Sequence, residues 1–157
     1  MEEITIKSTI HLAQLNELSA EERSLVEQAI EATQRSYAHY SKFRVGAAVL
    51  LENGVTLLGC NQENASFPAG TCAERAAIFA AGAQFPDTPI KMIAIAARTP
   101  DGELQEGPIS PCGICRQVIV ETETRHGNKI RILLYGKRGV YVVDGIETLM
   151  PLCFTEF

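Results

Sequence analysis

Residues 71–75 read Thr71-Cys72-Ala73-Glu74-Arg75, which places a thiol and a carboxylate two residues apart at the predicted start of a helix. Residues 110–116 read Ser110-Pro111-Cys112-Gly113-Ile114-Cys115-Arg116 and bring two further thiols to the start of another predicted helix. The first N–H groups of a helix are unsatisfied and carry the positive end of its dipole, so they favour the thiolate form of a nearby cysteine. The two segments therefore predict a metal site where two helices begin.

The predicted ligands of this site are three cysteines, Cys72, Cys112 and Cys115. Three protein ligands leave one position of tetrahedral zinc open, which is typical of a catalytic zinc site rather than a structural one. Glu74 is not expected to bind the metal, because it is better placed to accept a proton from a zinc-activated water and pass it to the substrate. Arg75, and after it Arg116, is expected to hydrogen-bond the sulfur atoms and offset their negative charge.

Other interpretations of the thiols remain open at this point. Cys112 and Cys115 form a Cys-x-x-Cys pair, which also occurs in redox proteins, and cysteines often only pack as small hydrophobic side chains. Alternatively, zinc only clamps the two helices and the protein is not an enzyme. That alternative requires a closed fourth coordination position, for which the sequence offers no further Cys or His at suitable spacing.

Composition narrows the class of protein. The chain has 157 residues, 46% of them hydrophobic, which fits one compact domain, and no apolar run approaches the roughly 20 residues of a membrane span. Its acidic start, Met1-Glu2-Glu3, lacks the order of a signal peptide, so we expect a cytoplasmic protein without a membrane partner. A net charge of −5 without a dense Lys/Arg cluster argues against nucleic acid and favours a small, weakly charged molecule as partner.

Around the two cysteine segments, helical and strand patterns alternate. Ser19 and Glu22 form a capping box that starts the first helix, and Glu22 is expected to lie on its solvent-exposed face. Helices are predicted over residues 20–36, 72–83 and 112–125. Strands are predicted over residues 45–51, 55–60, 90–97, 130–135 and 140–143.

This order of elements predicts an α/β fold with three layers, α/β/α, around a mixed five-stranded sheet. The sheet is expected to be mixed because short connections, Glu52-Asn53-Gly54 and residues 136–139, predict a hairpin near each end of the strand series. Residues 1–18 are predicted to be an N-terminal extension, and residues 19–157 the catalytic domain.

The cysteine segments resemble those of a known family. A three-cysteine zinc site with a non-ligating Glu and a Pro-Cys-x-x-Cys motif marks zinc-dependent nucleobase deaminases. Cys72-Ala73-Glu74 and Pro111-Cys112-Gly113-Ile114-Cys115 are similar to the cytidine deaminase family, in its three-cysteine, small-subunit branch. The resemblance, which extends from about residue 20 to the C-terminus, implies a cytidine deaminase-like fold and one Zn²⁺ per subunit. It also implies hydrolysis of cytidine and 2′-deoxycytidine to the uracil nucleosides and ammonia, a reaction of pyrimidine salvage.

The same resemblance implies which residues contact the substrate. Residues 40–48, Tyr40-Ser41-Lys42-Phe43-Arg44-Val45-Gly46-Ala47-Ala48, resemble the segment with the aromatic wall of the base pocket, which implies that role for Phe43. Residues 59–64, Gly59-Cys60-Asn61-Gln62-Glu63-Asn64, resemble the ribose-binding stretch and imply that Asn61 and Glu63 bind the sugar hydroxyls. The backbones of Ala73 and Ser110 are implied to bind the edge of the pyrimidine.

The C-terminal tail and one substitution complete the comparison with the family. Phe154 resembles an aromatic residue that reaches into a neighbouring subunit's site, which implies a homotetramer. Arg44 departs from the family, which usually has proline at that position.

Glu63 at the sugar would repel a phosphate, so a nucleoside is favoured over a nucleotide as the substrate. A related aminopyrimidine nucleoside such as blasticidin S is the alternative substrate.

Overall fold

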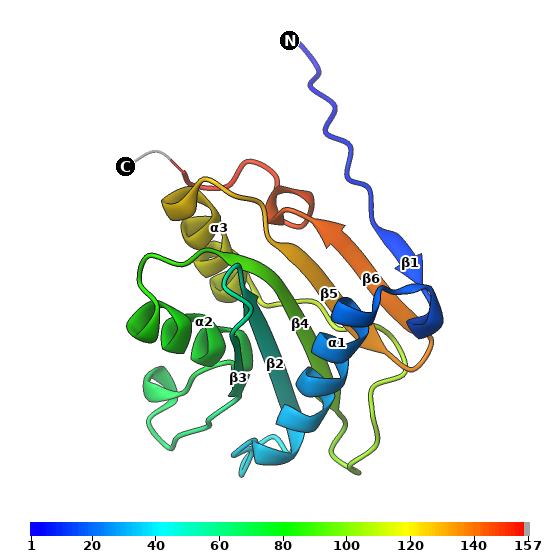
Figure 1. The fold of residues 1–157 in the computed structure, drawn as a ribbon, viewed down its shortest axis with the longest axis vertical. Helices are drawn as coiled ribbons and strands as arrows, with labels where there is room; N and C mark the ends of the chain where they lie inside the picture. Colours follow the sequence, from blue (N-terminus) through cyan, green and yellow to red (C-terminus); the bar gives the residue numbers. More distant parts are fainter. Residues whose placement is uncertain (156–157) are drawn as a thin grey trace.

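The computed structural model describes residues 1–155 and shows a mixed sheet between two layers of helices (Figure 1). The sheet has six strands in the order β1-β6-β5-β4-β2-β3. Helix α1 packs on one face, and helices α2 and α3 pack on the other. The predicted three-layer α/β/α architecture is therefore confirmed.

The elements lie close to their predicted positions. The strands are β1 (His11–Ala13), β2 (Arg44–Leu51), β3 (Thr56–Cys60), β4 (Ile90–Arg98), β5 (Arg131–Gly136) and β6 (Gly139–Asp144). The α-helices are α1 (Ala20–Ala32), α2 (Ala73–Gln84) and α3 (Gly113–His126). Short 3-10 turns are η1 (Leu15–Glu17), η2 (Thr33–Arg35), η3 (Phe67–Ala69) and η4 (Ile146–Thr148).

The predicted count of five strands is wrong, because β1 adds a sixth strand at one edge. β4 and β5 pair in parallel and the other neighbours pair antiparallel, so the prediction of a mixed sheet is confirmed. In β1, Leu12 pairs with Tyr141 of β6. Three residues are too few to show an alternating pattern, and the partner of β1 lies more than a hundred residues away in sequence, so the local pattern gave no signal for this strand.

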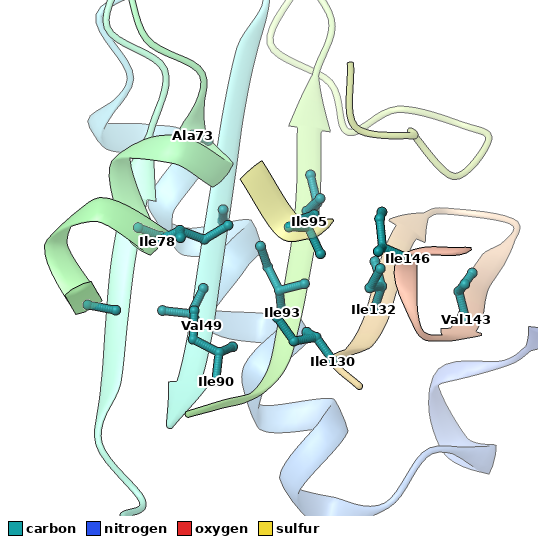
Figure 2. Close-up of a cluster of buried hydrophobic side chains, with 14 of the residues drawn as sticks. Val49, Ala73, Ile78, Ile90, Ile93, Ile95, Ile130, Ile132, Val143 and Ile146 are labelled. Carbon is teal, nitrogen blue, oxygen red and sulfur yellow. The ribbon is translucent and has the colours of Figure 1, made fainter. Parts of the chain in front are cut away.

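Alternate residues of the central strands face opposite helical layers. In β2, Val49 belongs to the core cluster shared with α2 and α3, and Leu50 to the cluster shared with α1. In β4, Ile93 belongs to the cluster shared with α2 and α3, and Ala94 to the cluster shared with α1. Figure 2 shows the first cluster, where side chains of the strands meet Ile78 of α2. Both strands are continuously apolar because helices bury both of their faces.

The capping box of α1 is present, but Glu22 is not solvent-exposed as predicted. Ser19 Oγ accepts a hydrogen bond from Glu22 N at 3.2 Å, and a Glu22 carboxylate oxygen accepts one from Ser19 N at 2.8 Å. The other carboxylate oxygen accepts a hydrogen bond from Arg131 of β5, which also pairs with Asp144 at 2.7 Å. The spacing of residues within α1 predicts which side of the helix is polar, but it carries no information about Arg131. The burial of Glu22 depends on this arginine, which comes from the sheet.

Two glycines allow helices to lie close against the sheet. A Cβ atom on Gly59 of β3 would lie 2.3 Å from the carbonyl oxygen of Ala73, in the first turn of α2. A Cβ atom on Gly46 of β2 would lie 2.2 Å from the carbonyl oxygen of Ala29 in α1. Each helix therefore approaches the sheet more closely than any other residue would permit at these positions. Among the described residues, no helix combines the length and apolar character needed to cross a membrane.

Candidate active site

Cys72 and Cys112 occupy equivalent positions at the starts of two helices. Each is the N-cap residue with an extended backbone, and neither side chain caps its own helix, so both sulfur atoms remain available to a metal. Cys115 follows in the first turn of α3 and is buried. The helices begin at Ala73 and Gly113, one residue after the predicted starts. The helix N-termini thus bring together three thiols that are far apart in sequence.

The spacing of the three sulfur atoms fits a zinc ion. The Sγ atoms of Cys72, Cys112 and Cys115 all lie within 4.8 Å of one another. Tetrahedral zinc with Zn–S bonds of about 2.3 Å separates its sulfur ligands by roughly 3.8 Å. Cys72 Sγ and Cys112 Sγ lie 3.9 Å apart, so little movement is needed to hold the metal. Within residues 1–155, these three cysteines are the side chains grouped closely enough to hold a metal ion.

Arg75 lies against the thiol cluster. Its Nη2 donates to Cys72 Sγ at 3.9 Å, and its Nε is buried without a hydrogen-bond partner among the described residues. Hydrogen bonding from Cys115, followed by that from Arg75 and Cys112, lowers the pKa of Cys72 to about 5 although burial acts in the opposite direction. Cys72 is therefore prepared as a thiolate ligand, with a guanidinium beside it to offset the charge.

Glu74 lies beside the cluster in the first turn of α2 and is 5% exposed. Burial raises the pKa of its carboxyl group above the ordinary 4.5, and the neighbouring Cys72 thiolate raises it further. The thiols form the metal-binding group without it. A buried carboxyl with a raised pKa next to a metal site is suited to carry a proton during catalysis.

A cavity of about 480 Å³ opens next to Cys72. It is lined by Tyr40, Ser41, Asn61, Gln62, Glu63, Asn64, Phe67, Gly70, Thr71, Cys72 and Arg75. Its walls therefore include four of the residues proposed from the sequence, Asn61, Glu63, Cys72 and Arg75. Its size suits a small organic ligand.

Main-chain pairing between Gln62 and Thr71 brings the two sides of this cavity together. Gln62 N donates to Thr71 O at 2.9 Å, and Thr71 N donates to Gln62 O at 3.0 Å. The pairing is antiparallel and closes the base of the loop formed by residues 63–70, so Glu63 lies just inside this loop and Cys72 just outside it. Thr71 had no role in the sequence prediction, and the structure gives it this one.

Asn61 connects the end of β3 to the start of β2. Its Oδ1 accepts hydrogen bonds from Val45 N at 2.8 Å and from Ser36 Oγ, while its Nδ2 donates to Phe43 O at 2.9 Å. An Asn side chain has two N–H donors, so one donor remains after these contacts. Asn61 thus holds the segment before β2 in place and keeps one hydrogen for a ligand.

Glu63 holds the loop before β2 over the cavity. One carboxylate oxygen accepts hydrogen bonds from Tyr40 N at 2.7 Å and Ser41 N at 3.2 Å, and the other accepts one from Ser41 Oγ. The hydrogen bond from Ser41, together with those from the two main-chain N–H groups, lowers the pKa of Glu63 below 4.5, so it is a carboxylate at neutral pH. A carboxylate has about four acceptor positions, and three are used here.

The other predicted substrate-binding residues are outside the lining of this cavity. Phe43 is half-buried directly before β2, and Ser110 is exposed two residues before Cys112. Ala73 is fully buried, so only its main chain is available to a ligand. Phe154 is 65% exposed, and its carbonyl oxygen accepts a hydrogen bond from Gln117 Nε2 at 3.1 Å.

Arg116 does not hydrogen-bond the sulfur atoms as the sequence suggested. Its Nε donates to Pro111 O at 2.9 Å and its Nη1 donates to Leu149 O. Conversely, Tyr40 and Ser41 line the cavity, although the sequence singled out only Phe43 in that stretch. Their place depends on Glu63, more than twenty residues later, and residue type alone gave no signal for it.

Comparison with known proteins agrees with this geometry. The family model of the cytidine and deoxycytidylate deaminase zinc-binding region matches residues 19–128. A cytidine deaminase from Sporosarcina psychrophila is 44% identical over 132 residues, which cover 84% of this chain and 90% of that protein. A cytidine deaminase from Halalkalibacterium halodurans is 41% identical over 97 residues, 62% of this chain and 68% of that protein.

Solved structures give the same result. The cytidine deaminase from Burkholderia pseudomallei superposes with a TM-score of 0.73 at 36% identity, covering 87% of this chain and 100% of that one. The cytidine deaminase from Mycobacterium tuberculosis superposes with a TM-score of 0.68 at 28% identity, covering 88% of this chain and 100% of that one. With three thiols and a buried glutamate gathered beside a cavity, the chain belongs to the cytidine and deoxycytidylate deaminase family.

Proposed function

We propose that the protein is a zinc-dependent cytidine deaminase that hydrolyses cytidine, and 2′-deoxycytidine, to the uracil nucleoside and ammonia. The observation that carries this proposal is the meeting of three thiols able to bind a metal with a buried Glu74, where one of the thiols, that of Cys72, lines a cavity of ligand size. The names of the relatives and solved structures support the same reaction.

Cys72, Cys112 and Cys115 would hold one zinc ion. When bound, zinc lowers the pKa of a water molecule to about 7 and so supplies the nucleophile for hydrolysis at neutral pH. The chain's own contribution is to keep three sulfur atoms at the spacing that the metal requires, and to place Arg75 against Cys72 so that the sulfur charge is partly neutralised.

Glu74 is assigned the proton transfers. Its carboxylate would accept one proton of the attacking water and deliver it to N3 of the cytosine ring, and would then accept the second proton from the hydroxyl group formed on C4 and deliver it to the amine, which leaves as ammonia. The oxygen of that water remains on C4 as the uracil carbonyl oxygen. Burial supports this role, because it raises the pKa of Glu74 and lets the side chain hold a proton closer to neutral pH than an exposed carboxyl group does.

Asn61 and Glu63 are proposed to bind the sugar. After their contacts within the protein, Asn61 has one N–H donor left and Glu63 about one acceptor position, which match the donor and acceptor properties of a hydroxyl group. Phe43 is proposed as the aromatic wall of the base pocket, and the backbones of Ala73 and Ser110 as partners of the pyrimidine edge. The charge of Glu63 favours a nucleoside, because a phosphate at this position would meet a carboxylate.

We further propose a cytoplasmic homotetramer in which Phe154 contributes to a neighbouring subunit's site. The position of Phe154 outside the lining of its own chain's cavity supports this arrangement. The mass of the particle in solution, measured by light scattering, tests it: a mass near four times the 17.1 kDa of the chain is expected, and a monomer would contradict it.

The test of the reaction combines metal content with turnover. We expect about one zinc per chain and release of ammonia from cytidine, with deoxycytidine as a second substrate and little turnover of deoxycytidylate.

Glu74→Gln should keep its zinc and lose turnover by about 10²–10⁴-fold. A Glu74→Gln variant that works at the parent rate would refute the mechanism. Rapid turnover of blasticidin S with none of cytidine would refute the substrate, and one bound zinc without turnover of any nucleoside would favour a purely structural metal.

A further inference from the structure

Arg116 lies directly after the ligand Cys115, but its guanidinium group contacts main-chain carbonyls. Nε donates to the carbonyl oxygen of Pro111 at 2.9 Å, and Nη1 donates to that of Leu149. The side chain is half-buried between the start of α3 and the turn η4. A guanidinium presents its donors in a rigid planar fork, so one arginine can fix two acceptors from separate segments relative to each other.

The first acceptor belongs to the peptide bond between Pro111 and Cys112. Fixing the plane of this peptide bond restricts the backbone of Cys112, and therefore the direction of its Sγ atom. This restraint is most important for Cys112, because its side chain is exposed whereas Cys115 is buried and Cys72 is half-buried. The other two side chains are more deeply buried, and Cys72 Sγ is also hydrogen-bonded by Arg75, so both sulfur atoms are held more firmly.

The second acceptor begins the C-terminal segment, residues 149–154. Leu149 ends the turn η4, with its N–H donating to Ile146 O at 2.9 Å. At the far end of the segment, Gln117 Nε2 donates to Phe154 O at 3.1 Å. Arg116 and Gln117 are consecutive residues of α3 and hold the two ends of this segment.

We propose that Arg116 is a positioning residue that fixes the Pro111 peptide and the C-terminal segment in one arrangement, so that zinc affinity and order of the C-terminal segment are coupled. The inference rests on the proposed function to the extent that Cys112 is a zinc ligand. It differs from the role of Arg75, which acts on the charge of the sulfur atoms. Arg116 acts on the geometry of one ligand.

The test compares Arg116→Gln and Arg116→Lys with a control on the same helix, Arg125→Gln. Arg125 is also an arginine of α3 whose Nη2 donates to a main-chain carbonyl, that of Pro86 at 2.9 Å, but it lies far along the helix from the ligands. The zinc dissociation constant is measured by competition with a chromophoric chelator. Hydrogen exchange of residues 149–155 is followed by mass spectrometry in the same samples.

Both Arg116 variants are expected to bind zinc about tenfold more weakly or worse, the usual effect of removing a group that orients a ligand. Both should also exchange faster over residues 149–155, while Arg125→Gln stays within about twofold of the parent, as expected for a surface contact that touches neither segment. Lysine keeps the charge but cannot bridge two carbonyls as a fork. An Arg116→Lys variant with the parent's affinity would therefore overturn the proposal, as would a tenfold loss in Arg125→Gln.

A second variant keeps the test decisive if Arg116→Gln does not fold. Gln117→Ala removes only the contact at the far end of the C-terminal segment, and should accelerate exchange there and weaken zinc binding by about two- to threefold, in line with the loss of one weak hydrogen bond. Faster exchange with unchanged zinc affinity would overturn the coupling. If the parent chain itself binds no zinc, the proposed function fails, which is a different result from a loss confined to the variants.

Discussion

Replacing Gly59 by alanine should damage the zinc site by displacing the start of helix α2. An added Cβ atom would lie 2.3 Å from Ala73 O, 2.5 Å from Ala77 N and 2.9 Å from Ala77 Cβ. Ordinary van der Waals contact begins near 3.4 Å, so the first turn of α2 must move by about 1.1 Å or β3 must bend. Two of these atoms belong to the backbone of a helix and cannot be relieved by a change of rotamer.

This displacement predicts two separate losses. Overpacking of this kind costs about 1–3 kcal/mol of folding free energy. In addition, Ala73 directly follows Cys72, so a shift of about 1 Å moves one sulfur atom relative to the other two. Metal–ligand distances tolerate only about ±0.2 Å, so zinc should bind at least tenfold more weakly unless the helix relaxes back on binding. Relaxation would appear as a further cost in stability.

Gly46→Ala is the matched control. Its Cβ atom would meet backbone atoms of α1 and of the turn η2 just as closely, with Ala29 O at 2.2 Å and Thr33 N at 2.5 Å, but neither element carries a proposed zinc ligand. Urea unfolding should show similar destabilisation of both variants, and chelator competition should show a loss of zinc affinity in Gly59→Ala alone. Equal zinc affinities in the two variants would refute the link between packing of α2 on β3 and the metal site.

Three further substitutions test contacts around the sheet and the cavity. Glu22→Gln keeps the capping box but loses the ion pair with Arg131. Because contacts with Ser19 and Arg131 outweigh burial and hold the pKa of Glu22 below 4.5, its contribution is present above that pH and is lost on acidification. Urea unfolding should show the variant less stable by about 1 kcal/mol near neutral pH and equal to the parent in acid; a constant difference would contradict this. Glu123→Gln should show the opposite trend, because burial raises the pKa of Glu123 above 4.5, so the parent loses stability relative to the variant as the pH rises above that value. A parent that gains stability relative to the variant would show that the two main-chain N–H groups bound by Glu123 favour its ionised form. Ser41→Ala removes a hydrogen bond that holds Glu63, so the KM for cytidine should rise about fivefold with little change in kcat; an unchanged KM would show that the loop is held without it.

Local signals predicted much of the fold and the metal site. The capping box of Ser19, the helix starts beside Cys72 and Cys112, and the tight turn at Gly54, whose φ is +83°, all depend on residues adjacent in sequence. Contacts made across long stretches of sequence were missed or misassigned. Arg131 buries Glu22 from another layer, and Arg116 bonds to Leu149, which lies beyond two further strands. Such contacts depend on the order of strands in the sheet, for which residue patterns carry little information.

The order of the strands in the sheet also explains why Cys72 and Cys112 lie close together. β2 lies between β3 and β4 and is antiparallel to both, so β3 and β4 run in the same direction and end at the same edge of the sheet. Helix α2 follows β3, helix α3 follows β4, and both pack on the same face. Their N-termini must therefore return toward a common region, with an N-cap cysteine on each. The hairpin of β2 and β3 follows from the turn between them, but the pairing of β2 with β4 is a contact between segments some forty residues apart. An inserted segment that reversed β4 relative to β2 would keep every motif residue and separate the ligands, so the metal site is a property of the topology as much as of the motifs.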